Sequence, residues 1–265
     1  MDSAQAVESQ SVNEGHRAWL ESDGTTFWSR SSPSHVGSSV IALISSVYER
    51  DPRWARRIIR HRIHTTEPLG EASWGSVKVA ARRVVFSCPP LKAFSGTSVE
   101  LIPAASTADE NLSEWVRTRV NGRRFSGADE IWSFLDQLVR EAERVKPRIM
   151  ALPVSAILLD AEGAVLSWGV NSAWDYRTQH SETNLIRRWH RQGSPGAPAA
   201  LWVTRKPCKM CSGWIWDGLL MQVPIGIRYR DPDDGPLART TVLDPGTFER
   251  RRADAAKMEA ADASG

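Results

Sequence analysis

Two short polar segments, about 25 residues apart, constrain the fold of this chain more than any other feature. The first contains His180 and Glu182, and the second contains Cys208 and Cys211. One imidazole and two thiolates are zinc ligands, and a set of three protein ligands leaves a fourth position open, as in catalytic zinc sites. The chain must therefore fold so that residue 180 meets residues 208 and 211.

Each segment is predicted to begin a helix, with a strand over residues 201–204 between them. Cys208 and Cys211 are three residues apart, so on a helix they face one side and can bind one ion. Pro207 suits the first turn of that helix, where unpaired N–H groups also favour thiolate over thiol. An α/β arrangement would bring both helix starts to one edge of a sheet.

Glu182 has a different predicted role from its neighbour. It is two residues from His180, about 200° around a helix, so it should not bind the same ion through the same face. It is placed to reach a water at the open position instead. C-x-x-C alone is also typical of a redox pair or of half a structural zinc site. A closed site with a fourth ligand such as His190 would leave Glu182 without a role.

The second half of the chain has a clear α/β pattern. Apolar spacing predicts a helix from residue 126 that ends before Pro147, and then a hairpin of strands over 154–159 and 164–170. Further elements are predicted after the cysteine helix: a strand over 224–229, an antiparallel return over 239–243, and a charged helix over 248–261.

The first half carries no motif with an evident chemistry, and no internal repeat is apparent in the sequence. It is predicted to contain a hairpin over 19–28 around Asp23-Gly24, two helices over 36–63, strands over 74–86 and 98–102, and a helix over 112–120. Ser34 is a candidate cap for the first helix, and Pro52 is expected near the start of the second. We therefore expect a disordered tail over 1–14, an accessory α+β domain over 15–122, and a domain over 123–265 that holds the metal ligands.

The second of those two helices is rich in arginine. Its basic side chains could form a phosphate-contacting face or a solvated face, and the solvated face is the preferred interpretation because charge runs alone seldom indicate binding. These residues are Arg50, Arg53, Arg56, Arg57, Arg60 and Arg62.

Composition sets limits on compartment and partners. The chain has a net charge of +3, which is compatible with an anionic partner without indicating one. Of its 3 cysteines, two lie in C-x-x-C and Cys88 is isolated, so a disulfide framework is not expected. We therefore expect a cytoplasmic location. Residues 1–13 lack the pattern of a secretory signal, and no apolar run approaches the ~18 residues of a membrane span. We therefore expect no membrane partner.

Read together, H-x-E and P-C-x-x-C form the signature of zinc nucleobase deaminases. Residues 126–245 resemble the cytidine deaminase-like superfamily, especially its tRNA-adenosine and deoxycytidylate deaminase branch. Residues 152–159 resemble the first strand of that branch, residues 168–171 its second strand, and residues 201–211 its strand-to-metal segment. Ser181 stands where alanine is usual, and Arg205-Lys206 where an acidic residue often precedes the proline.

The resemblance implies a three-layer α/β/α fold with a mixed sheet and a Zn²⁺ ion as cofactor. It assigns the zinc ligands to His180, Cys208 and Cys211, the proton shuttle to Glu182, and a substrate contact to Asn171. By resemblance, a homodimer is also expected. Trp174 and Tyr176 precede the metal segment, where they could stack on a base or form a lid packed on the core.

The expected reaction is hydrolytic deamination. Glu182 would take a proton from water, the resulting hydroxide would attack the ring carbon that bears the amino group, and ammonia would leave. Three functions remain open at this point. The preferred one is a deaminase of a cytosine-type or adenine-type base within DNA or RNA. The others are a deaminase of a free nucleoside, nucleotide or related heterocycle, and a non-catalytic zinc-stabilised binding module, which would not need Glu182.

Overall fold

The computed structural model of the chain describes most of its length. The described residues are 16–59, 62–66, 69–80, 86–87, 97–101, 110–145, 147, 152–173, 178–220 and 225–231. Several predictions lie outside these residues: the tail over 1–14, Cys88, the return strand over 239–243 and the helix over 248–261. None of the helices in the described ranges is both long and apolar enough to cross a bilayer.

The second half builds a mixed four-stranded sheet in the order β7-β6-β8-β9. Strands β6 and β7 form the predicted hairpin, β6 pairs antiparallel with β8, and β8 pairs parallel with β9. The parallel pair makes the sheet mixed, as predicted. The strands are β6 (Ser155–Leu159), β7 (Val165–Val170), β8 (Ala200–Arg205) and β9 (Gly226–Asp231).

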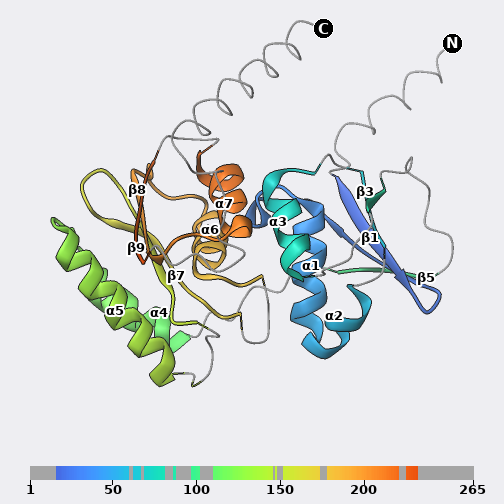
Figure 1. The fold of residues 1–265 in the computed structure, drawn as a ribbon, viewed down its shortest axis with the longest axis horizontal. Helices are drawn as coiled ribbons and strands as arrows, with labels where there is room; N and C mark the ends of the chain where they lie inside the picture. Colours follow the sequence, from blue (N-terminus) through green and yellow to red (C-terminus); the bar gives the residue numbers. More distant parts are fainter. Residues whose placement is uncertain are drawn as a thin grey trace, which may run out of the picture.

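Helices cover both faces of this sheet, so the predicted α/β/α layering is confirmed (Figure 1). Because side chains alternate along a strand, Ile157 and Leu159 pack in one core and Ala156 and Leu158 in the other. The first core is closed by α4 (Glu110–Val120) and α5 (Ala128–Val145), and the second by α6 (Ser181–Arg191) and α7 (Lys209–Ile215). A π-helical turn over Trp216–Leu220 follows α7.

The first half builds a second, five-stranded sheet in the order β4-β3-β1-β2-β5. The predicted hairpin is confirmed, and its turn residues Asp23 and Gly24 have φ angles of 52° and 73°, as a two-residue hairpin turn requires. The strands are β1 (Arg17–Ser22), β2 (Thr25–Arg30), β3 (Ile63–Thr65), β4 (Phe86–Ser87) and β5 (Thr97–Glu100).

Three helices accompany this sheet: α1 (Ser39–Arg50), α2 (Pro52–Ile58) and α3 (Glu71–Ala80). Asp51 caps α2 with its carboxylate, which accepts from the N–H of Arg53 at 2.7 Å, and Pro52 follows at the predicted start. The cap of α1 is Ser38, whose hydroxyl accepts from the N–H of Ile41, rather than Ser34. On α2 the side chains of Arg53, Arg56 and Arg57 are exposed, as a solvated face requires.

The predicted strand over 74–86 is wrong for its first part, because residues 71–80 form α3. The buried positions Ala72, Ser76 and Ala80 recur with helical spacing. Their side chains are small, so the sequence shows no apolar helical stripe. The helix is stabilised by packing on α7, which the sequence of this segment alone does not reveal.

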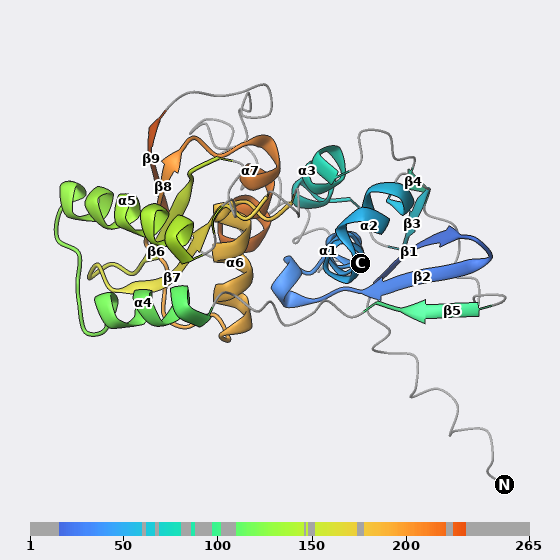
Figure 2. The same cartoon turned by 90° about the horizontal axis from the view of Figure 1, so that it is seen from below.

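The two halves share a core. Ile41 of α1 and Ala72 of α3 belong to the same buried cluster as Met210 and Trp214 of α7. Figures 1 and 2 show the two sheets at opposite ends of the molecule, with α1, α3, α6 and α7 between them. The helix that carries the cysteines is therefore enclosed between the two halves.

Candidate metal centre and active site

The two metal-ligand segments occupy equivalent positions on neighbouring helices. His180 is the N-cap of α6 and Cys208 is the N-cap of α7, each with an extended backbone. Neither side chain caps its own helix. Pro207 immediately precedes this N-cap instead of lying in the first turn as predicted.

The three predicted ligand atoms form a nearly equilateral triangle. Nδ1 of His180 lies 3.5 Å from Sγ of Cys208 and 3.4 Å from Sγ of Cys211, and the two sulfurs are 3.5 Å apart. Tetrahedral Zn²⁺ with ordinary Zn–S and Zn–N bond lengths needs ligand separations of roughly 3.6–3.8 Å. The donor set and its spacing therefore fit a zinc ion bound by these three residues.

The alternative forms of a C-x-x-C site agree less well with this geometry. Both cysteines are free thiols, and the Nδ1 atom of His180 lies against both sulfurs, which a simple dithiol pair does not require. His190, the candidate fourth ligand, binds the hydroxyl of Ser194 through Nδ1 at 3.1 Å. Among the described residues, the potential metal-binding group comprises His180, Cys208 and Cys211 alone.

Glu182 lies in the first turn of α6 and is 4% exposed. Burial raises the pKa of its carboxyl group, and the negative charge of Cys208 raises this pKa further. The hydroxyl of Ser181 donates a hydrogen bond to Oε2 of Glu182 at 2.8 Å. Glu182 is thus outside the ligand triangle but close enough to sense its charge, which is the arrangement expected of a proton shuttle.

The two thiols differ in their tendency to ionise. Hydrogen bonds from Cys211 and His180 hold the pKa of Cys208 well below its ordinary value. Burial raises the pKa of Cys211, and the nearby charges of Cys208 and Glu182 raise it further. Cys208 is therefore the first thiolate of the pair, and a bound cation would favour ionisation of the second.

The substrate contacts predicted from the sequence are only partly described. Asn171 is buried, its Nδ2 donates to the carbonyl of Leu152 at 3.0 Å, and its Oδ1 accepts from the N–H of Ala173 at 2.9 Å. These bonds fix the amide, whose remaining hydrogen-bonding capacity is one N–H and one lone pair. Trp174 and Tyr176 lie outside the described residues.

Sequence reasoning did not assign a role to Ser181, although its hydroxyl contacts the shuttle carboxylate. The signal was present, since a hydroxyl-bearing residue adjoins Glu182 in the H-x-E segment. The part played by α3 was also missed. Asp217, just after α7, accepts a hydrogen bond from the N–H of Ala72 at 3.0 Å, so the start of α3 is bound to the end of the metal helix.

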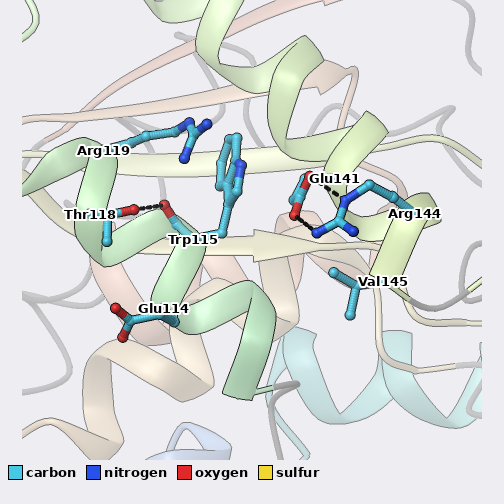
Figure 3. Close-up of a pocket in the computed structure, with 7 residues that line it drawn as sticks. All are labelled: Glu114, Trp115, Thr118, Arg119, Glu141, Arg144 and Val145. Atoms are coloured by element: carbon cyan, nitrogen blue, oxygen red, sulfur yellow. Dashed lines mark hydrogen bonds and ion pairs between the residues drawn. The ribbon is translucent and has the colours of Figure 1, made fainter.

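A surface pocket of about 550 Å³ lies between α4 and α5 (Figure 3). These helices cover the sheet face opposite α6 and α7, so the pocket is separate from the metal ligands. Both arginines of the pocket contact other residues that line it. Arg144 pairs with Glu141 at 2.6 Å, and the guanidinium of Arg119 lies 4.3 Å from the ring centre of Trp115. Nothing in this pocket indicates a particular ligand.

Comparison with known proteins agrees with the motif. Residues 150–254 match the model of the Bd3614-like deaminase family. None of the curated proteins matches the chain. Similar solved structures include guanine deaminase from Bacillus subtilis, at 21% identity and a TM-score of 0.33, covering 40% of this chain and 65% of that chain.

Two further structures are similar at the same level. One is a mutant protein in complex with 8-azaguanine, at 20% identity and a TM-score of 0.39, covering 52% of this chain and 81% of that chain. The other comes from studies of A-to-I editing by tRNA:A34 deaminases, at 21% identity and a TM-score of 0.32, covering 44% of this chain and 90% of that chain. Likenesses at this level do not identify a substrate.

The family match includes every ligand of the triangle and Glu182. It confirms the resemblance to the cytidine deaminase-like superfamily of deaminases that the sequence motifs predict.

Proposed function

We propose that the protein is a zinc-dependent hydrolytic deaminase that converts an amino-substituted nucleobase to its carbonyl form and releases ammonia. One observation carries this proposal: the His180, Cys208 and Cys211 donors converge within 3.5 Å of one another beside the buried carboxyl group of Glu182. A scaffold that only needed zinc for stability would gain nothing from a buried carboxyl group at this place, because such a group is costly to bury.

Zn²⁺ bound by the three donors would supply a Lewis acid with an open position for water. The chain supplies the proton transfers. Glu182 would accept a proton from the attacking water and return it to the ring nitrogen beside the reacting carbon. It would then carry the proton of the newly added hydroxyl group to the amino group. The C–N bond breaks as the C=O bond forms, so the water oxygen stays on the base as the carbonyl oxygen and the amino group leaves as ammonia. Ser181 would keep the carboxylate of Glu182 oriented during these transfers.

We further propose that the reacting base belongs to DNA or RNA. Support comes from basic residues next to Cys208: Arg205 and Lys206 at the end of β8, and Lys209 at the start of α7. All three are partly exposed, so cationic groups adjoin the metal ligands and would favour phosphate. Asn171 remains our candidate for contact with the sugar of the substrate.

Mass spectrometry of deamination products tests the proposal. Purified protein and its Glu182→Gln variant would be incubated with free bases, nucleosides, nucleotides, single- and double-stranded DNA, and tRNA. We expect a gain of about one dalton on a base within a polymer, lost in the variant although it retains zinc. A gain on free nucleosides or nucleotides alone would contradict the polymer assignment. Full activity in Glu182→Gln would contradict the mechanism.

A further inference from the structure

We propose that the chain is an internal pseudo-dimer. In this arrangement, the first sheet and its helices are a second copy of the metal-bearing unit that has no metal site of its own. The copy takes the place of a partner subunit and positions the metal helix α7. The inference rests on the proposed metal site, but it does not depend on the identity of the substrate.

The two sheets have the same topology. Read from β4, the first sheet has the order β4-β3-β1-β2, and read from β9, the second has the order β9-β8-β6-β7. Strand directions agree throughout: β1–β2 and β6–β7 are antiparallel, β1–β3 and β6–β8 are antiparallel, and β3–β4 and β8–β9 are parallel. Strand β5 is an addition at the edge of the first sheet.

Two helices occur at the same places in both sequences of elements, whereas, among the described residues, α2 has no counterpart between β7 and β8. Helix α1 follows the hairpin β1–β2 as α6 follows β6–β7, and α3 follows β3 as α7 follows β8. Trp28 of β2 faces Trp19 across the first hairpin, and Trp168 of β7 faces Ile157 at the corresponding position of the second. The same strand order and strand directions, repeated together with two helices, indicate that the two halves share one fold.

Contacts between the halves show how the two copies are related. The indole Nε1 of Trp214 donates to the hydroxyl of Ser76 at 3.0 Å, and Arg187 pairs with Glu49 at 2.6 Å. Both pairs are separated by 138 residues. The first residues of α3 and α7, Glu71 and Lys209, have the same separation. Equivalent positions that touch each other lie on a two-fold axis. Ser76 and Trp214 lie at equivalent positions of α3 and α7, so this pair marks a pseudo-two-fold axis between the copies. The first residues of α1 and α6, Ser39 and Ser181, are 142 residues apart (181 − 39), so Glu49 and Arg187 join the two copies at non-equivalent positions.

Two glycines show the reciprocal contacts that such an axis requires. A Cβ atom on Gly75 of α3 would lie 2.5 Å from Cα of Met210, and one on Gly213 of α7 would lie 2.7 Å from the backbone N of Ala72. Gly75 corresponds to Gly213, and Ala72 to Met210, at the same separation of 138 residues. The two helices thus interlock backbone to backbone, and each glycine is needed by the helix of the other copy.

The same correspondence explains why one copy is inert. His180 and Cys208 immediately precede α6 and α7, and the corresponding positions before α1 and α3 are taken by Ser38 and Gly70. Ser73 stands at the position of Cys211, and its hydroxyl lies 2.8 Å from that of Ser38. Val40, the second residue of α1, stands at the position of Glu182, the second residue of α6, and is buried in an apolar core. The first copy therefore has neither the ligands nor the shuttle.

The interlock bears directly on the metal site. Met210 lies between the two cysteine ligands, and Gly213 and Trp214 follow Cys211 within one turn. Helix α3 therefore contacts α7 at the turn that sets the distance from both sulfurs to His180. Helix α3 thus covers this face of α7.

Cobalt binding to the full-length protein tests this positioning role. Apo-protein would be titrated with Co²⁺ against a competing chelator, and the thiolate-to-cobalt absorption bands would be recorded for the wild type and for Gly75→Ala and Gly213→Ala. In an unconstrained helix, glycine to alanine is stabilising. Here we expect affinity for Co²⁺ to fall about 10-fold to 100-fold, as when supports of metal ligands are removed, with altered bands.

Two controls separate positioning from general loss of stability. Gly127→Ala adds a methyl group where no atom lies within 4 Å, and Val47→Ala opens a cavity in the first core away from α7. Both should keep the affinity and the bands of the wild type, although Val47→Ala lowers the midpoint of unfolding. If the interlock variants do not fold, Ser76→Ala decides, because it removes only the hydroxyl that binds Trp214.

The inference would be overturned if folded Gly75→Ala and Gly213→Ala had the cobalt affinity and absorption bands of the wild type. If these two variants do not fold, the same result for Ser76→Ala would overturn it. A protein that binds cobalt as expected but deaminates nothing would contradict the proposed function and leave this inference intact.

Discussion

The two halves of this molecule show one topology used in two ways. In the second half, the helix starts after the hairpin and after β8 carry His180, Glu182, Cys208 and Cys211. In the first half, the corresponding positions are taken by Ser38, Val40, Gly70 and Ser73, of which Ser38, Val40 and Ser73 are buried. The difference teaches that the fold alone brings two helix starts close together. A metal site forms there only where these helix starts carry ligand side chains.

The largest expected difference between the halves is in zinc binding. Cys211→Ala should lose the metal and the stability that comes with it, since a ligand at 1,000 times its Kd stabilises a protein by about 4 kcal/mol. Ser73→Ala, at the corresponding position of the first half, should keep zinc and lose only the hydrogen bond to Ser38. Zinc content by atomic emission and urea unfolding measure both effects. Equal zinc loss in the two variants would contradict the assignment of halves.

The buried ion pair between α1 and α6 is expected to have the next largest effect. The side chains of Glu49 and Arg187 are 10% and 5% exposed, so Glu49→Ala leaves a buried charge unpaired and should cost about 3–5 kcal/mol of unfolding free energy. The double exchange Glu49→Arg with Arg187→Glu restores opposite charges at the two positions and should recover most of that loss. Urea unfolding curves provide the test, and a double exchange no better than Glu49→Ala would contradict the pairing of these two charges between the halves.

A smaller effect is expected from Ser181 of the metal-bearing half, whose hydroxyl contacts Glu182. Ser181→Ala removes a hydrogen bond to an acidic group, which is worth about 1.5–3 kcal/mol, so kcat should fall about 10-fold or more. KM should change little, because Ser181 acts through Glu182. Steady-state kinetics of Ser181→Ala and Ser181→Thr distinguish orientation from packing. Failure of the threonine hydroxyl to restore kcat would favour packing.

The smallest effect is expected at the outer face of the second sheet. Arg230 of β9 binds Asp136 of α5 at 2.6 Å, and this hydrogen bond lowers the pKa of Asp136. The folded pKa lies below the unfolded value of about 3.9, so the pair stabilises the protein above that pH and the contribution is lost as pH falls through the folded pKa. Because both side chains are more than one-third exposed, we expect at most about 1 kcal/mol.

Asp136→Asn should therefore lower the free energy of unfolding slightly at pH 7, and its difference from the wild type should be smaller at pH 3. Urea titrations at both pH values measure this. A difference that grows on acidification would have the wrong sign for a carboxylate with a lowered pKa.

Local patterns in the sequence predicted the metal site because its parts are short-range. His180 and Glu182 lie within three residues, Cys208 and Cys211 within four, and a hairpin and a single strand set their helices in place. The hairpins and α5 were also predictable, since alternation and helical spacing are properties of single segments.

The internal copy was not predictable in the same way. Its signal is a long-range correspondence between positions such as Gly75 and Gly213, and the motif residues that would have marked it are replaced by Ser38, Gly70 and Ser73. Helix α3 was misread as a strand for a related reason. Its small residues, such as Gly75 and Ser76, are favoured by close approach to α7 rather than by the helix itself.

The most direct test of the comparison is a native mass spectrum of the full-length protein, in which zinc ions are counted per chain. We expect one zinc ion in a single chain, bound by the second half, with no need of a second subunit. Two zinc ions per chain would contradict the assignment of the first half as an inert copy. A zinc-free protein in a zinc-containing buffer would contradict the metal site itself.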